Sequence, residues 1–241
     1  YKTLQVQVID ETILQLTLNR PEVCNAINID MMQDMLRFWQ ALEDDSEFRC
    51  VVITGVGKAF CAGADLKARK DLDVKTWLEQ HGVLQQAMLA MIACPIPIIS
   101  AVNGAAFGGG LELVLASDFA YSVNTATFGQ SEVKLGIMPG AMGTQNLPRA
   151  VGIRRAKELT FTGKPFSAAE ALQWGIINQL FDAQQLLPEV LATAKIIASN
   201  APLAIKQAKR ALNIADTKAV SEGYRFEVDV YNQLIPTKDR I

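Results

Sequence analysis

Two glutamates lie close to a run of glycines in the sequence, and their carboxyl groups could serve as a general acid and a general base. Glu112 comes two residues after Gly108-Gly109-Gly110, and Glu132 ends the later stretch Phe128-Gly129-Gln130-Ser131-Glu132. Successive glycines let a ligand approach the backbone where any Cβ would block it. The apolar run from Leu111 to Ala116 predicts a buried helix, so the glycines lie at its N-terminus, where backbone N–H groups are free.

A second loop could complete such a site. The stretch from Lys58 to Leu66 holds small residues just after a predicted strand and opens toward a helix, a setting that leaves N–H groups free for a ligand. When N–H donors from two loops converge on one oxygen they form an oxyanion hole, which stabilises a developing negative charge. Two such loops beside two carboxylates indicate the active site of an enzyme.

The first part of the chain predicts strands and helices that alternate around these loops. Strands are expected at Thr3–Ile9, Thr12–Leu18, Cys50–Thr54, Ile98–Val102 and Phe119–Val123, the first two as a hairpin through Asp10-Glu11. Helices are expected at Asp30–Leu42 and Val74–Cys94, the second stopped by Pro95 and Pro97. This alternation is typical of an α/β layered domain.

After Gly143 the pattern becomes mostly helical. Helices are expected at Arg154–Phe161, Ala168–Trp174, Leu186–Ser199, Leu203–Ala215 and Val220–Leu234, with one strand near Ile176–Phe181. We therefore expect a core of residues 1–185, which carries the site, and a C-terminal helical region of residues 186–241.

Composition excludes several classes of function. The chain has 23 Lys and Arg against 25 Asp and Glu, and a formal net charge of −2, so it has no overall attraction to nucleic acid or to an anionic membrane. Cys24, Cys50, Cys61 and Cys94 lack the spacing of a metal site, which favours reduced, packed thiols. The single histidine, His81, excludes a metalloprotease pattern. No apolar stretch is long enough to span a bilayer.

The ordered motifs of the chain resemble those of the crotonase (enoyl-CoA hydratase/isomerase) superfamily over essentially its whole length. The matching landmarks are Asn19-Arg20-Pro21 with Asn25-Ala26, FCAGADL at Phe60–Leu66, AVNGAAFGGGLEL at Ala101–Leu113, FGQSEVKLGIMPGAMGTQNLPR at Phe128–Arg149 and FTGKPFSAAEALQWGIIN at Phe161–Asn178. The resemblance implies a spiral of repeated strand-strand-helix units with a C-terminal helical trimerisation region. It also implies homotrimers, commonly paired into hexamers.

The resemblance assigns roles to particular residues. The N–H groups of Ala62 and Gly109 are expected to hold the thioester oxygen of an acyl-CoA. Glu112 and Glu132 occupy the positions of the two glutamates found in hydratases of this family. The residues expected to bind substrate and CoA are Asn25, Ala26, Ala62, Gly63, Ala64, Asp65, Leu66, Gly108, Gly136 and Pro139.

These roles predict an enoyl-CoA hydratase, which adds water across the 2,3 double bond of a 2-enoyl-CoA. Attack of water at Cβ moves charge onto the thioester oxygen, where two N–H donors stabilise it. Glu112 is expected to activate the water as a base, and Glu132 to protonate Cα as an acid. No metal or other cofactor is needed, since coenzyme A is part of the substrate. We expect the enzyme in the cytoplasm, or in the mitochondrial matrix if the source is eukaryotic, because reduced, packed cysteines fit an intracellular compartment.

Several alternatives stay open at this point. The chain could instead isomerise double bonds or hydrate a branched, carboxylated enoyl-CoA of the methylglutaconyl type. A protein of another class, an RNA-binding protein with the same scaffold, would use Lys206, Lys209 and Arg210, which form a small basic face on a predicted helix. Glu112 could also form a buried ion pair with Arg149 or Lys134, and Glu132 could be a solvated turn residue.

The chain departs from the family pattern at a few positions. Met142 and Asn146 stand where a glycine and an arginine are common, and Ser131 replaces a frequent proline. Met142 is expected to narrow or reshape the acyl pocket. The sequence ends at Asp239-Arg240-Ile241, where relatives usually continue with a helix that helps to cover CoA.

Overall fold

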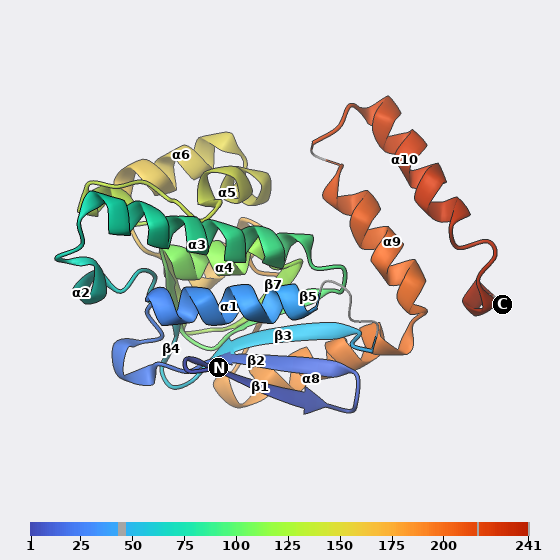
Figure 1. Ribbon diagram of the computed structural model, residues 1–241, viewed down its shortest axis with the longest axis horizontal. Coiled ribbons are helices and arrows are strands. Elements are labelled where there is room, and N and C mark those ends of the chain that lie inside the picture. Colours follow the sequence, from blue (N-terminus) through green and yellow to red (C-terminus); the bar gives the residue numbers. More distant parts are fainter. Residues whose placement is uncertain (43–46, 216, 241) are drawn as a thin grey trace.

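The computed structural model describes residues 1–42, 47–215 and 217–240 (Figure 1). Its strands are β1 (Leu4–Ile9), β2 (Ile13–Leu18), β3 (Cys50–Gly55), β4 (Ala59–Cys61), β5 (Ile98–Val102), β6 (Ala105–Phe107), β7 (Phe119–Val123), β8 (Thr127–Gly129), β9 (Phe166–Ser167) and β10 (Gln179–Phe181). Its α-helices are α1 (Ile29–Ala41), α2 (Leu66–Arg69), α3 (Val74–Ala93), α4 (Gly109–Ala116), α5 (Gly143–Val151), α6 (Ile153–Thr162), α7 (Ala168–Gln173), α8 (Ala183–Ser199), α9 (Pro202–Asn213) and α10 (Val220–Asn232). Short 3₁₀ helices are η1 (Pro21–Val23), η2 (Glu132–Leu135) and η3 (Lys238–Arg240).

The larger sheet has six strands in the order β1-β2-β3-β5-β7-β10. β1 and β2 form the expected antiparallel hairpin, and its turn places Asp10 and Glu11 at φ of 46° and 64°. The other neighbours are parallel. Every residue of β3 and β5 is buried, as in a parallel sheet that is covered on both faces.

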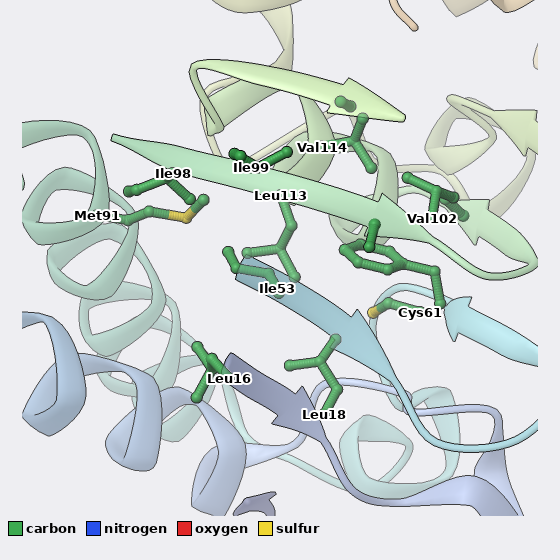
Figure 2. Close-up of a cluster of buried hydrophobic side chains, with 14 of the residues drawn as sticks. Leu16, Leu18, Ile53, Cys61, Met91, Ile98, Ile99, Val102, Leu113 and Val114 are labelled. Atoms are coloured by element: carbon green, nitrogen blue, oxygen red, sulfur yellow. The ribbon is translucent and has the colours of Figure 1, made fainter. Parts of the chain in front are cut away.

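Helices cover both faces of this sheet. α1 packs against α3 on one face, while α8 packs on the other against β2, β3, β5, β7 and β10 (Figure 1). Apolar side chains from strands β2 to β5 meet others from α3 and α4 in the core, where Leu18, Ile53 and Leu113 are almost fully buried (Figure 2). Burial of apolar surface contributes about 25 cal/mol per Å² to the free energy of folding. This core is therefore the main source of the protein's stability.

The smaller sheet positions the two glycine-containing loops. Its order is β4-β6-β8-β9, and β4 and β6 are parallel, with Ala59 opposite Ala105 and Cys61 opposite Ala106. Because the carboxyl ends of parallel strands meet at one edge, the loop after β4 (62–65) lies beside the loop after β6 (108–110). Ligands in open α/β sheets bind at such edges.

The separate helical part at the C-terminus begins later than the expected boundary at residue 186. Leu186, Val190 and Ala194 of α8 are buried in the core, so this helix belongs to the layered part of the molecule. α9 and α10 instead pack side by side and extend away from the sheets (Figure 1). Residues 216 and 241 of this region lie outside the described residues. Its role in trimer formation stays a prediction.

After Gly140, local features also differ from the sequence-based expectation. The segment Gly143–Val151, for which no element was expected, forms α5. The strand expected at Ile176–Phe181 is shorter, because the N–H groups of Ile176 and Ile177 both donate to the carbonyl of Ala171. Over the ranges that the structure describes, no helix combines the length and the apolar character needed to cross a bilayer.

Candidate active site

The two loops touch because glycine occupies the contact point. A Cβ at Gly110 would lie 2.1 Å from the carbonyl oxygen of Cys61, which no side chain could tolerate. Gly109 begins α4, so its N–H has no partner within the helix. An ideal Cβ at Gly63 would come within 3.3 Å of the nitrogen of Gly109, which shows how closely the loops approach.

The hydrogen bonds of the first loop correct one expected oxyanion-hole donor. The N–H of Ala62 donates to the carbonyl of Cys24 at 2.9 Å, so it is already occupied. Two residues later, Ala64 forms a parallel bridge with Ile27 in which only the flanking groups, the carbonyl of Gly63 and the N–H of Asp65, pair with Ile27.

In such a bridge the N–H of Ala64 points away from Ile27. Within the part of the chain that the structure describes, neither this group nor the N–H of Gly109 has an acceptor. Both residues line the same cleft. The geometry therefore replaces Ala62 by Ala64 as the partner of Gly109.

Glu112 is buried and held by backbone donors. Its Oε1 accepts hydrogen bonds from the N–H groups of Ala141 and Gly143, at 2.8 Å and 2.7 Å. Burial raises its pKa to about 7, the negative charge of Glu132 adds to this effect, and the two backbone hydrogen bonds oppose it. A carboxyl group with this pKa can accept and release a proton near neutral pH.

Glu132 begins η2 and is also buried, with 9% of its surface exposed. Its Oε1 accepts a hydrogen bond of 2.7 Å from Nε2 of Gln130. Its Oε2 is buried and has no partner among the described residues. Burial raises the pKa of Glu132, which favours the protonated form.

Gly108 lets the second glutamate reach the glycine loop. Its φ of +49° is unfavourable for residues with a side chain, and a Cβ at this position would lie 3.2 Å from Oε1 of Glu132. The glutamate therefore sits directly against the turn that presents the N–H of Gly109. Both carboxyl groups and both free N–H groups face one cleft of about 760 Å³, a size typical of small-molecule sites.

The structure rules out the ion pairs considered for Glu112. Over the described residues, no salt bridge involves Glu112 or Glu132. Arg149 donates instead to the backbone carbonyl of Gln145 at 2.6 Å. Lys134 lines the cleft but is exposed, and its side chain leans toward Gly163. Glu132 is not a solvated turn residue either, because it is buried.

The other expected binding residues fall into two groups. Gly63, Leu66, Gly108 and Pro139 line the cleft together with Ala62 and Ala64, whereas Asn25, Ala26, Asp65 and Gly136 are not among its lining residues. Asn25 is fully buried and its amide donates to three backbone carbonyls, of Val56, Ala59 and Phe60. Asp65 caps α2 and forms a salt bridge of 3.0 Å with Arg20. These two residues brace the loops rather than line the site, and CoA binding by the whole set stays a prediction.

Several residues of the site were not expected from the sequence. Gln130 positions Glu132, and the backbone of Ala141 and Gly143 positions Glu112. Arg69 and Trp77 also line the cleft. Gln130, Ala141 and Gly143 all lie in the matched motif Phe128–Arg149, which was the only signal for them in the sequence.

Comparison with known proteins identifies the family. The family model described as "Enoyl-CoA hydratase/isomerase" matches residues 8–240. The chain belongs to this family. YngF of Bacillus subtilis, whose name places it among enoyl-CoA hydratases and isomerases, is 42% identical over 96% of this chain and 89% of its own length. The crotonyl-CoA hydratase of Syntrophomonas wolfei is 37% identical over 96% of this chain and 89% of its own.

Solved structures of family members have the same fold. The crystal structure of an enoyl-CoA hydratase from Bacillus anthracis matches with a TM-score of 0.96 at 35% identity, over 99% of this chain and 93% of that one. The family resemblance and the α/β fold expected from the sequence are thus confirmed. In the described parts of this enoyl-CoA hydratase/isomerase family member, no three His, Cys, Asp or Glu side chains group as a metal site would require.

Proposed function

We propose that this protein is an enoyl-CoA hydratase, which adds water in the syn sense to a 2-enoyl-CoA and yields a 3-hydroxyacyl-CoA. One observation carries the proposal: two N–H groups without an acceptor among the described residues, of Ala64 and Gly109, and two buried carboxyl groups, of Glu112 and Glu132, face one cleft. The names of the relatives from Syntrophomonas wolfei and Bacillus anthracis support it.

The N–H groups of Ala64 and Gly109 bind the thioester oxygen, whose negative charge grows as water attacks Cβ. Donors that are already in place need no reorganisation during the reaction, and loss of one such donor typically costs about 3–4 kcal/mol in the transition state. Both donors are backbone groups, so their positions depend on the bridge at Ile27 and on the start of α4.

Glu112 acts as the base and Glu132 as the acid. The two backbone donors fix Oε1 of Glu112, which leaves its second oxygen to take a proton from water. Glu132 has a raised pKa and an unpartnered Oε2, which suits a protonated carboxyl that delivers its proton to Cα. Because the two carboxyl groups influence each other, they titrate as a pair.

Hydration of crotonyl-CoA, followed by loss of the enoyl thioester absorbance, tests this function. Glu112→Gln and Glu132→Gln should each lower kcat by about 10²–10⁴-fold. Glu158→Gln is the matched control, because Glu158 is an exposed residue of α6 outside the cleft. Failure of the wild-type protein to hydrate any short or medium enoyl-CoA would refute the proposal.

Double-bond isomerisation is the nearest alternative activity, and the same variants distinguish it. An isomerase moves a proton between two carbons and needs no activated water, so Glu112→Gln should reduce hydration far more than isomerisation of a 3-enoyl-CoA. Equal loss of both activities would show that Glu112 does not have the separate role of activating water.

The RNA-binding alternative loses its main structural support. Lys209 is buried, and its Nζ donates to Asp118 and to the carbonyl of Ile96, at 2.7 Å and 2.9 Å. Arg210 stacks over Phe226 at 5.6 Å. The expected basic face is therefore interrupted at its centre. Salt-dependent binding to RNA would revive this alternative.

We also propose an assembly and a cellular location for the protein. A homotrimer, or a hexamer made of two trimers, is supported by the apolar residues that α10 exposes, namely Val220, Tyr224, Val228 and Tyr231. Light scattering of the purified protein would test this state. A cytoplasmic or mitochondrial-matrix location is compatible with the mouse relative, whose name includes "mitochondrial".

A further inference from the structure

A lone arginine stands in the wall of the cleft. The side chain of Arg69, the last residue of α2, stacks over the ring of Trp77 on α3, with 5.0 Å between the guanidinium carbon and the ring centroid. Both residues line the cleft that holds Glu112 and Glu132. Most neighbours on this side are apolar, since Leu66, Leu78 and Leu84 line the same wall.

Among the described residues, the guanidinium group of Arg69 has no ion-pair partner. No salt bridge or side-chain hydrogen bond joins it to another of the residues that the structure describes. The charge of Asp65 acts on Arg69, but this carboxylate is already engaged: Oδ2 pairs with Arg20 at 3.0 Å, and Oδ1 accepts from the N–H of Ala68 at 3.1 Å. Arg69 is half-buried, and burial lowers its pKa, which reflects the cost of removing an unpaired cation from water.

Contacts along α3 connect Arg69 with the glutamate loop. Trp77 and His81 are one helical turn apart and so share a face of the helix. An ideal Cβ on Gly140 would lie 2.7 Å from Cε1 of His81, so the imidazole packs against the residue just before Ala141, which donates to Glu112. Burial lowers the pKa of His81 and the positive charge of Arg69 lowers it further, so the two groups also interact electrostatically.

A cation at this place is unsuited to a purely hydrocarbon acyl tail. Methylene groups packed over an unpaired guanidinium would remove its remaining hydrogen bonds to water and would offer no acceptor in their place. A carboxylate would instead accept two parallel hydrogen bonds from the planar fork of donors. The ring of Trp77 holds the guanidinium in one orientation, which reduces the entropy lost when such a pair forms.

We propose that Arg69 binds a carboxylate at the far end of the acyl group, so that the preferred substrates are CoA monothioesters of unsaturated dicarboxylic acids. This inference rests on the proposed function, because it names the acyl class of the same site. In this arrangement the carboxylate lies beside Arg69, and the 2,3 double bond lies between the two glutamates.

Binding of saturated thioesters to the full chain tests the inference without relying on catalysis. Glutaryl-CoA carries the terminal carboxylate, and pentanoyl-CoA has the same number of acyl carbons without it. By titration calorimetry, the wild-type protein should bind glutaryl-CoA at least tenfold more tightly than pentanoyl-CoA. Arg69→Met keeps length and apolar contact but removes the donors, so the ratio of the two affinities should fall to near one.

A second arginine provides a matched control. Arg155 stacks over Trp174 at 4.5 Å in the same manner but does not line the cleft, so Arg155→Met should keep the wild-type ratio. The inference is overturned if the wild-type protein has no preference for glutaryl-CoA, or if the preference survives in Arg69→Met. It is also overturned if Arg69→Met weakens the binding of both thioesters and of free CoA equally, because that result would mean that Arg69 binds a phosphate group of CoA.

Kinetics then separate this inference from the proposed function. Hydration of crotonyl-CoA without a preference for glutaryl-CoA would leave the hydratase proposal standing and refute the role of Arg69. An Arg69-dependent preference for glutaryl-CoA without hydration of any enoyl-CoA would do the reverse.

Discussion

The backbone N–H of Gly143 donates to Oε1 of Glu112 over 2.7 Å, and this contact fixes the orientation of the carboxyl group that is proposed to activate water. The approach is possible only for glycine, since a Cβ at this position would also lie 2.7 Å from the same oxygen. The residue before it, Met142, has a φ of +74°. The loop that holds Glu112 therefore contains a strained residue where the family commonly has glycine.

Replacing Met142 by glycine and by alanine should separate strain from packing. Both variants lose the side chain that packs against the core, but only glycine also removes the strain of the left-handed backbone. We expect the glycine variant to be about 1 kcal/mol more stable than the alanine variant. Urea denaturation of both proteins measures the difference. An alanine variant as stable as the glycine one would show that the backbone at this position stores no strain.

The stability of the protein should decrease as pH rises, because of Glu112. Its pKa is about 7 in the folded state against an ordinary value of 4.5, so the folded state holds a proton that the unfolded state has released between these values. Stability from this group is thus full at low pH and is lost as pH rises toward 7. Glu112→Gln keeps the acceptor for Ala141 and Gly143 but cannot ionise.

The free energy of unfolding of Glu112→Gln, taken relative to that of wild type, should therefore be about 1–3 kcal/mol higher at pH 8 than at pH 5. Glu158→Gln provides the control, because its carboxylate is exposed and should show no comparable change. A Glu112→Gln variant whose stability relative to wild type does not depend on pH would contradict the raised pKa.

Gln130 should tune the acid–base pair without touching substrate. Burial raises the pKa of Glu132, and the hydrogen bond from Nε2 of Gln130 opposes this effect. Gln130→Met removes the donor in a fully buried place. Because this hydrogen bond stabilises the charged form, its loss should raise the pKa of Glu132 further.

The pH profile of kcat/KM is the measurement for Gln130→Met. If Glu132 must be protonated to act, the alkaline limb of the profile should move to higher pH. Gln173→Met, at an exposed position of α7, should leave the profile unchanged. A profile that keeps its shape while activity falls overall would mean that Gln130 has only a structural role.

The buried ion pair between Lys209 and Asp118 should anchor α9 to the sheet. Only 9% of the lysine side chain is exposed, against 24% of the aspartate, and Nζ also donates to the carbonyl of Ile96. Lys209→Met leaves the aspartate unpaired, so the free energy of unfolding should fall by about 2–4 kcal/mol.

Two further variants test the pair. Adding Asp118→Asn should recover part of the loss, since a neutral amide no longer leaves a charge unpaired. Lys206→Met, three residues away on the same helix, should change the free energy of unfolding much less. Equal stabilities of Lys209→Met and wild type in urea would show that the pair does not anchor the helix.

Local patterns in the sequence were sufficient to predict many of the helices and strands. Alternating residues predicted β1, β2 and their turn, and apolar residues at helical spacing predicted α1 and α3, because these patterns depend on neighbours along the chain. The strands β4, β6, β8 and β9 have only two or three residues each, too few to show a period. Their pairing is set by contacts between distant segments.

The sequence by itself determined the family, the pair of glutamates and the glycines that make room beside them, since all of these follow from residue types in order. Only the tertiary structure decided that Lys209 is buried against Asp118 and that, among the residues it describes, Ala64 rather than Ala62 keeps a free N–H and Arg69 lacks an ion-pair partner. The physical reason is the same in each case. Whether a donor is free or a charge is paired depends on the group that lies opposite it in space, and that group belongs to a distant part of the chain.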